Sequence, residues 1–472
     1  MRKPVRYIST RGASPALDFA DAMLTGLARD GGLYVPEFWP QFSADDIAAM
    51  AGRDYAEVAY RVIRPFIGAV LDAGTTRAIV EETYSVFTHS AVAPLRELAP
   101  NHWLMELFHG PTLAFKDYAM QLLGNLFNHV LAARGRRVTI IGATSGDTGS
   151  AAIEACRGRE AIDIFILFPN GRVSDVQRRQ MTTVDTANVH AIAVDGTFDD
   201  CQALLKDMFN DSGFRDEVAM SGVNSINWAR ILGQIVYYFV AAAALGCWER
   251  KISFAVPTGN FGNIYAGYAG QRMGLPISHL VLATNANDIL SRLLTTGTMS
   301  REEVHPSLSP SMDIQVASNF ERYLFELLGR DGTQVEQQMA VFRDTGELAL
   351  CDEALSQARD MFSGFRLDDA DTLEEISQRY ETAGELLDPH SAIGVAGGAA
   401  NRLEAAIPMV SLATAHPSKF PDAVQKATGI SPPLPAHLAD LMARAERFDV
   451  IANDLAAVQS FVRERLAERK VI

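Results

Sequence analysis

Short apolar runs that alternate with segments of helical periodicity constrain the fold of this chain most strongly. From about Trp103 onward the apolar runs are WLMELF, VTIIGA, IDIFILF, VHAIAV, ISFAVP, HLVLAT and PMVSLAT. Between them, apolar residues recur at helical spacing over residues 117–133, 150–156, 198–209, 228–245 and 262–273. Strands that alternate with helices indicate parallel βαβ units, in which helices cover both faces of a sheet. The sequence therefore predicts an α/β fold with two doubly wound parallel-sheet lobes.

The first part of the chain has a different pattern, which predicts an extra N-terminal domain. A helix is expected from Pro15 to Ala28, followed by a turn and a short extended piece at RDGGLYVPEFWP. We predict three domains, over residues 1–95, 96–225 and 226–472. The first lobe would then contain Lys116 and the SGDTG loop, and the long apolar helix around Ile231–Leu245 would separate the two lobes.

Charge and composition exclude several classes of partner. The 472 residues carry a formal net charge of −15, whereas a nucleic-acid partner would require a basic footprint. The longest apolar run, residues 235–248, is too short to cross a membrane, and no apolar segment of a signal peptide follows the basic N-terminus. The four cysteines lie far apart, without the spacing of a zinc or redox site. We therefore expect a cytoplasmic protein without nucleic-acid, membrane or metal partners, either a monomer or a homodimer.

Two glycine-rich loops follow predicted strands and open predicted helices. They are GATSGDTGSAA, residues 142–152, and VPTGNFGNIYAG, residues 256–267. Exposed N–H groups at a helix N-terminus bind anions. Neither loop is a GxGxxG or GxxxxGK[ST] nucleotide motif. Either loop alone is equally compatible with a well-capped turn, but together they favour a site that grips a phosphate and a second anion.

Lys116, in the stretch HGPTLAFKD, occupies an unusual place for a lysine. It lies where a predicted strand gives way to a helix, beside the apolar Phe115. Apolar neighbours and the positive end of a helix both disfavour an ammonium ion, so we expect the pKa of Lys116 to be lowered unless Asp117 faces it. An amine that is partly neutral can form a Schiff base with an aldehyde. A lysine whose ammonium simply reaches solvent remains the alternative for this residue taken alone.

Pyridoxal 5′-phosphate is a cofactor that would use all three features. It has an aldehyde for a lysine and a phosphate for a helix N-terminus, and its amino-acid substrates bring a carboxylate for the second loop. From the residues alone a nucleotide-binding dehydrogenase also remains open, although no GxGxxG motif supports it.

Several longer segments resemble the threonine synthase family, whose members have the pyridoxal-phosphate fold called type II or tryptophan-synthase-β-like. The resembling segments are YISTRG, GLARDGGLYVP, FHGPTLAFKDYAMQ, ATSGDTGSAA, VNSINWARILGQIVYY, VPTGNFGN, ATNANDIL, SMDIQVASNFER, DPHSAIG and LATAHPSKF. HGPTLAFKD and TAHPSKF are the specific ones, whereas SGDTG alone indicates only the broader fold.

The resemblance implies a role for each matching residue. Lys116 would bind the cofactor covalently and then move protons, and the hydroxyl of Thr414 would face the pyridine nitrogen. The phosphate would lie on the backbone of Gly259, Asn260, Phe261, Gly262 and Asn263. The substrate carboxylate and the cofactor's O3′ side would face Ser145, Gly146, Asp147 and Thr148. Asp147 departs from relatives of the same fold, which often have asparagine there.

The resemblance further implies that O-phospho-L-homoserine and water are converted to L-threonine and phosphate, by γ-elimination and then β-addition of water. In a chain of net charge −15 the substrate phosphate needs local hydrogen-bond donors. We predict that Arg322 binds this phosphate, with Arg11 as a second candidate. The runner-up activity is that of a serine/threonine dehydratase or a cysteine-synthase-like enzyme, which lacks the YISTRG–DGGLYVP region. A catalytically silent homologue that binds phosphorylated ligands is a third possibility.

Overall fold

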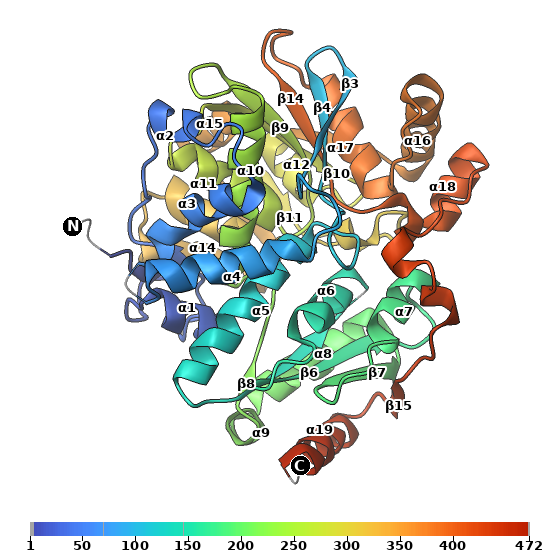
Figure 1. Ribbon diagram of the computed structural model, residues 1–472. Coiled ribbons are helices and arrows are strands. Elements are labelled where there is room, and N and C mark those ends of the chain that lie inside the picture. Colours follow the sequence, from blue (N-terminus) through green and yellow to red (C-terminus); the bar gives the residue numbers. More distant parts are fainter. Residues whose placement is uncertain (1–3, 69, 145, 471–472) are drawn as a thin grey trace. The chain divides into compact units, whose positions relative to one another are not determined.

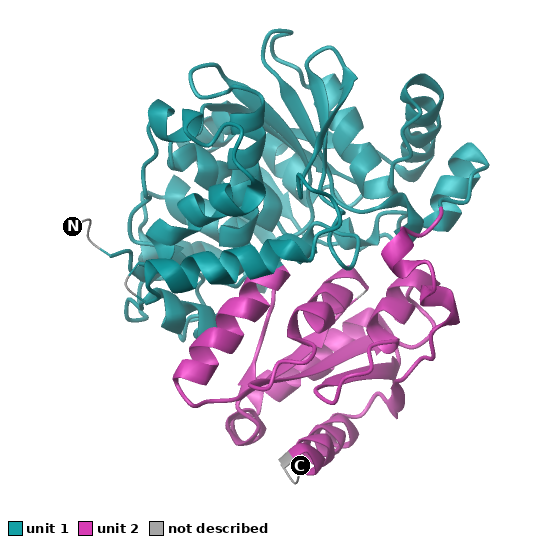
Figure 2. Ribbon diagram, viewed as in Figure 1, with its two compact units in different colours: residues 1–119, 225–432 teal, residues 120–224, 433–472 magenta. Residues whose placement is uncertain are grey.

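The computed structural model describes residues 4–68, 70–144 and 146–470 of the chain. They form two compact units (Figure 2). Unit 1 comprises Met1–Ala119 and Ser225–Pro432, and unit 2 comprises Met120–Asn224 and Pro433–Ile472.

A six-stranded sheet forms the centre of unit 1 (Figure 1). Its strand order is β13 (Phe362–Arg366), β10 (Ile277–Thr284), β9 (Ile252–Pro257), β14 (Met409–Ala413), β4 (His102–Glu106) and β3 (Leu95–Ala99). Neighbouring strands are parallel except for the β3–β4 pair, which is antiparallel. The predicted strands at residues 103–108, 252–257, 279–284 and 408–414 are therefore present, and β3 and β13 extend the sheet at its two edges.

Helices cover both faces of this sheet, as the continuous apolar runs predicted. Side chains of successive strand residues point to opposite faces. Phe254 packs its ring 4.7 Å from that of Tyr238 in α10 (Trp228–Ala244). A Cβ added at Gly398 in α17 (Pro389–Ala400) would lie 3.1 Å from the Cβ of Ala255, on the other face. The same β9 strand is therefore buried from both sides.

The N-terminal region is built onto α10 of unit 1. It contains α1 (Phe19–Thr25), α2 (Ala44–Ala48), α3 (Tyr55–Ile67), α4 (Ala73–Ser85) and the antiparallel pair β1 (Tyr7–Ser9) and β2 (Tyr34–Pro36). Helix α3 packs against α10, and Tyr7, Trp39 and Phe66 each place a ring 5.9–6.0 Å from that of Trp228, at the start of α10. The predicted helix at residues 15–28 is shorter because Gly26, with a φ of 69°, ends it.

The other elements of unit 1 surround the sheet. They are α11 (Gly262–Arg272), α12 (Ile289–Thr296), β11 (Thr298–Ser300), η1 (Pro310–Met312), α13 (Phe320–Leu327), α14 (Gly332–Thr345), β12 (Glu347–Ala349), α15 (Asp352–Met361), α16 (Asp369–Ala383), η2 (Pro417–Lys419) and α18 (Pro421–Thr428). The acidic stretch at residues 367–382 lies almost entirely in α16.

Unit 2 contains a second, wholly parallel sheet. Its strand order is β15 (Asp449–Ala452), β7 (Val189–Asp195), β6 (Ile162–Pro169), β5 (Val138–Ala143) and β8 (Met220–Ser221). Its helices are α6 (Asp147–Cys156), α7 (Asp175–Thr182), α8 (Phe198–Asn210), α9 (Ser212–Glu217), η3 (Ala436–Leu438), η4 (Leu441–Ala443) and α19 (Leu455–Lys470). Leu167 clusters with residues of α8 and α19, whereas Ile166 faces Gly149 of α6. Two doubly covered parallel sheets therefore confirm the predicted fold class.

The compact units do not coincide with the three predicted ranges. Strand β4 precedes Lys116 but pairs with β14, more than 300 residues later, because parallel strands are neighbours in space rather than in sequence. Lys116 consequently belongs to unit 1, and the C-terminal β15 joins the sheet of unit 2. The start of helix α5 (Lys116–Ala133) lies in unit 1 and its remainder in unit 2.

Helix α10 also differs from its predicted place between two lobes. It lies within unit 1, where it packs against α3 and α11. Helix α10 contains most of the longest apolar run of the sequence. Its apolar composition is explained by its burial between these neighbouring helices and the sheet. Over the described residues, no helix combines the length and hydropathy that a membrane span requires.

Candidate active site

The carboxyl ends of three neighbouring strands carry the residues predicted to hold a cofactor. Strand β9 leads into the TGNFGN loop at residues 258–263, β14 ends directly before Thr414, and β4 leads into the segment that ends at Lys116. Because β14 lies between β9 and β4 and all three are parallel, the three segments emerge at one edge of the sheet. Unit 1 therefore contains Lys116, Thr414 and the TGNFGN loop together.

Lys116 is held at this edge by its own backbone. The N–H of Phe115 donates to the carbonyl of Thr414 at 2.9 Å, and Ala114 forms a bridge with Ala415. The Lys116 side chain is 9% exposed, with Nζ 3.5 Å from the hydroxyl of Ser311 and 5.0 Å from the centre of the Phe115 ring. Most of Lys116 is thus covered by unit 1, with its amine near Ser311 and the Phe115 ring.

The carboxylate of Asp117 is bound within the turn that precedes Lys116. This carboxylate accepts from the N–H and the hydroxyl of Thr112, at 2.8 and 2.6 Å. The carbonyl of Thr112 accepts from Nζ of the buried Lys419 at 2.7 Å. A Cβ at Gly110 would lie only 2.5 Å from the Cβ of Asp117, so this tight turn requires glycine. Asp117 therefore stabilises the turn that precedes Lys116.

The TGNFGN loop offers unpaired donors at the N-terminus of α11. Phe261 is the N-cap residue, with a left-handed φ of 62° and no side-chain hydrogen bond to the helix. The hydroxyls of Tyr237 and Tyr238 donate to Oδ1 of Asn263 at 2.5 and 3.0 Å, which fixes the orientation of the amide. Nδ2 of Asn263 is then buried without a hydrogen-bond partner among the described residues. A buried unpaired donor beside open N–H groups fits a phosphate.

Asn319 supports this loop from behind. Its N–H and its Nδ2 both donate to the carbonyl of Asn260 at 3.1 Å. A Cβ at Gly259 would lie 2.6 Å from the carbonyl oxygen of Ser311, so the loop can approach the η1 segment only because this residue is glycine. Asn319 and Ser311 therefore define the position of the loop within unit 1.

Arg322, which we predicted to bind the substrate phosphate, uses its guanidinium for hydrogen bonds within unit 1. It is fully buried and donates to the carbonyl of Tyr34 at 3.1 Å, to the carbonyl of Ile226 and to Oδ1 of Asn319. Burial lowers its pKa to about 10, so the side chain is still charged at neutral pH. All three of these hydrogen bonds are made to groups within unit 1. We therefore reassign Arg322 to a structural role.

Arg11, the second predicted candidate, also makes ion pairs within unit 1. It contacts the buried Glu321 at 3.0 Å and Glu336 at 3.3 Å. Sequence reasoning had no means of separating these two arginines from surface ones, because their partners come from distant segments of the chain.

Ser311 and His390 were not predicted to be part of the site. Ser311 contacts Lys116, and its N–H donates to Nε2 of His390 at 3.2 Å. Both residues lie in segments that carry the family resemblance, SMDIQVASNFER and DPHSAIG, and this was the one available signal.

The SGDTG loop lies in unit 2, at the carboxyl end of β5. Ser145 lies outside the described residues. The hydroxyl of Thr144 accepts from the N–H groups of Gly146 and Gly149, each at 2.9 Å, and Gln177 donates to the buried carboxylate of Asp147 at 2.9 Å. The N-cap residue of α6 is Gly146, which has no side chain, so Thr144 supplies the side-chain acceptor at this helix end. That Ser145, Gly146, Asp147 and Thr148 face the substrate stays a prediction.

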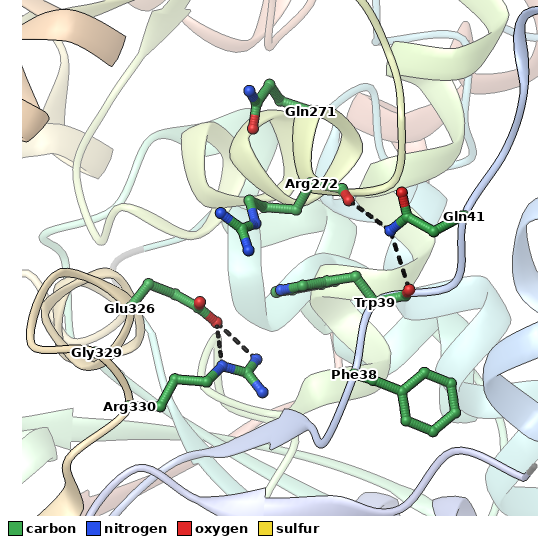
Figure 3. A pocket seen from close by; sticks show the side chains of 8 residues that line it. All are labelled: Phe38, Trp39, Gln41, Gln271, Arg272, Glu326, Gly329 and Arg330. Atoms are coloured by element: carbon green, nitrogen blue, oxygen red, sulfur yellow. Dashed lines mark hydrogen bonds and ion pairs between the residues drawn. The ribbon is translucent and has the colours of Figure 1, made fainter.

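A pocket of about 720 Å³ in unit 1 lies away from these residues (Figure 3). It is lined by Phe38, Trp39, Gln41, Gln271, Arg272, Glu326, Gly329 and Arg330. Arg330 donates to Glu326 at 2.7 Å and to the carbonyls of Pro36 and Glu37. None of the predicted site residues lines it, so we do not assign the chemistry to this pocket.

Comparison with known proteins defines first the class and then the family. The family model described as pyridoxal-phosphate dependent enzyme matches residues 88–343, which include Lys116 and the TGNFGN loop. Two further models, threonine synthase N terminus and threonine synthase C-terminal, match residues 6–84 and 391–462. The chain belongs to the threonine synthase family.

Individual relatives agree over the whole length. Threonine synthase of Pseudomonas aeruginosa is 56% identical, over 97% of this chain and 98% of its own. The crystal structure of pyridoxal-phosphate-bound threonine synthase from Brucella melitensis has a TM-score of 0.96 at 54% identity, covering 98% of this chain and 99% of that one. Yeast threonine synthase has a TM-score of 0.93 at 37% identity, with the same coverage. The predicted family and fold are confirmed.

Proposed function

We propose that the chain catalyses the conversion of O-phospho-L-homoserine and water to L-threonine and phosphate, with pyridoxal 5′-phosphate as its cofactor. The observation that carries the proposal is the meeting of Lys116, Thr414 and the TGNFGN loop at one sheet edge, in a chain that matches threonine synthases from end to end. The N-terminal match at residues 6–84 favours this activity over that of a dehydratase or a cysteine-synthase-like enzyme.

The residues fit the two ends of the cofactor. Nδ2 of Asn263 and the first N–H groups of α11 would hold the phosphate, and Gly259, Asn260, Phe261 and Gly262 shape the loop around it. The Thr414 hydroxyl would face the ring nitrogen. When bound, pyridoxal phosphate supplies an aldehyde that condenses with amines and a ring that stabilises negative charge at the substrate Cα.

Lys116 would perform the proton transfers on the substrate. Its Nζ would first hold the cofactor and, once displaced by the substrate amine, take the proton from Cα. The same Nζ can return a proton at the end, because the backbone bonds of Phe115 and Ala114 keep it at the edge of the sheet. A well-placed base of this kind contributes about 10²–10⁴-fold to the rate of each transfer.

The proposal is tested by the products and by the colour of the protein. Purified protein supplied with cofactor should show the absorbance band of a lysine-bound pyridoxal group and release phosphate and threonine from O-phosphohomoserine. Lys116→Ala should lose both, whereas Lys206→Ala, on α8 of unit 2, is the matched control. Ammonia release from threonine or serine in place of phosphate release would instead support the dehydratase. A colourless wild-type protein would contradict the cofactor assignment.

We also propose that the reaction takes place in the cytoplasm. All four cysteines are free, and Cys156, Cys201 and Cys247 are buried. Free cysteines are typical of a reducing compartment.

A further inference from the structure

Asp388 links two separate parts of the site through hydrogen bonds. It is the N-cap residue of α17, fully buried, and its carboxylate accepts from the N–H groups of His390 and Ser391 at 3.0 and 3.2 Å. The cap alone would use only these two donors. The carboxylate also accepts from Nδ1 of His390 at 2.8 Å and from the hydroxyl of Ser391. Two side chains are thus oriented by one carboxylate.

The first branch leads through His390 to Lys116. Nε2 of His390 accepts from the N–H of Ser311, so Nδ1 must carry the ring proton that is donated to Asp388. Ser311, held in this way, places its hydroxyl 3.5 Å from Nζ of Lys116 and its carbonyl oxygen against Gly259 of the TGNFGN loop. His390 is 3% exposed, so water does not compete for Nε2.

The second branch leads through Ser391 to Thr414. The Ser391 hydroxyl donates to Asp388, and its oxygen accepts from the N–H of Thr414 at 3.0 Å. The carbonyl of Thr414 accepts from the N–H of Phe115, next to Lys116. Both peptide groups of Thr414 are therefore held by hydrogen bonds, which fixes the direction of its Cα–Cβ bond.

We propose that Asp388 and His390 are positioning residues for the lysine chemistry. Through Ser311 they hold the amine of Lys116, and through Ser391 they hold Thr414, so that one buried carboxylate sets both the reacting end and the ring-nitrogen end of the cofactor site. The inference rests on the proposed function for the identity of the cofactor.

The test compares His390→Leu with His390→Gln in the full chain. Two quantities are measured. The first is the rate at which cofactor-free protein captures pyridoxal phosphate, monitored through its absorbance in a stopped-flow instrument. The second is the steady-state rate with O-phosphohomoserine, which gives kcat and KM. A displaced reacting group costs up to about 10²-fold in rate, so His390→Leu should slow capture and lower kcat by about 10- to 100-fold, with little change in KM. His390→Gln, whose Oε1 can accept from the N–H of Ser311, should recover much of both.

Two further variants separate positioning from folding. His102 is a buried histidine of the same unit whose Nε2 contacts the hydroxyl of Ser411 at 2.9 Å, so His102→Gln should lower the melting temperature and leave capture unchanged. Ser311→Ala keeps the backbone N–H and removes the hydroxyl near Lys116; it should slow capture without lowering the melting temperature. If His390→Leu does not fold, the capture rate of Ser311→Ala tests the positioning role.

Ser391→Ala should shift the absorbance maximum of the bound cofactor, because Thr414 loses its acceptor. Wild-type capture rates in both Ser311→Ala and His390→Leu would overturn the proposal, as would equal rates in His390→Gln and His390→Leu. Capture needs no amino-acid substrate. A wild-type protein that captures the cofactor but forms no threonine would therefore contradict the proposed function and leave this test intact.

Discussion

At the scale of single residues, burial separates arginines that serve the fold from those that can meet a ligand. Arg322 lies in a segment that carries the family resemblance, yet its guanidinium bonds three groups within unit 1. One of these is Asn319, which in turn donates to the carbonyl of Asn260 in the TGNFGN loop. Its effect on the site is therefore indirect.

Arg322→Lys tests this role. A lysine cannot reproduce the planar fork that spans Tyr34, Asn319 and Ile226, so we expect the free energy of unfolding to fall by about 2–4 kcal/mol. Cofactor affinity should fall as well, through the loosened Asn319. Urea denaturation and cofactor titration measure the two effects. Arg343→Lys, at an exposed ion pair, should leave both unchanged. A higher KM for O-phosphohomoserine with unchanged stability would instead restore Arg322 as a substrate ligand.

At the scale of elements, two strands carry histidines, one buried and one partly buried, that cannot easily take up a proton. Burial lowers the pKa of His102 on β4 to about 4, and the positive charges of Arg379 and Arg402 add to this effect. Burial and the positive charge of Arg465 likewise lower the pKa of His190 on β7 to about 4. In the unfolded chain a histidine titrates near 6.5. Between these two values the unfolded chain binds protons that the folded chain does not, so stability falls as the pH is lowered from about 6.5 to about 4.

We expect this loss to be about 3 kcal/mol for a histidine whose pKa is lowered from 6.5 to about 4. His102→Gln removes one titrating group, so unfolding of unit 1 should depend less steeply on pH in this window. Urea denaturation at several pH values from 4 to 7 measures the slope. An unchanged slope would show that His102 is not a source of the acid sensitivity.

At the scale of the whole molecule, the N-terminal region and the sheet of unit 1 share one core. The region matched as threonine synthase N terminus, residues 6–84, contributes Tyr7, Trp39 and Phe66 to the aromatic cluster around Trp228. This region therefore packs into the same core as α10.

Trp228→Ala should consequently weaken α3 and α10 together. Removing a fully buried tryptophan costs about 3–5 kcal/mol. Hydrogen exchange of backbone amides should accelerate in both helices, and the urea midpoint should fall. Leu403→Ala, at a leucine that is 58% exposed, provides the control. Unchanged exchange in α3 would show that the N-terminal region folds independently, as the sequence first suggested.

The sequence by itself determined the fold class, most strands and helices, and the places of the two glycine-rich loops and of Lys116 after strands. Alternating hydrophobicity, glycine spacing and a lysine beside apolar residues are local signals. The domain ranges, the true contacts of Arg322 and Arg11, and the joining of Asp388, His390 and Ser311 to Lys116 were decided only by the tertiary structure. The physical reason is the parallel sheet: its order β9–β14–β4 brings together residues about 150 to 300 positions apart, and no local pattern records which distant segment will supply a buried group with its partner.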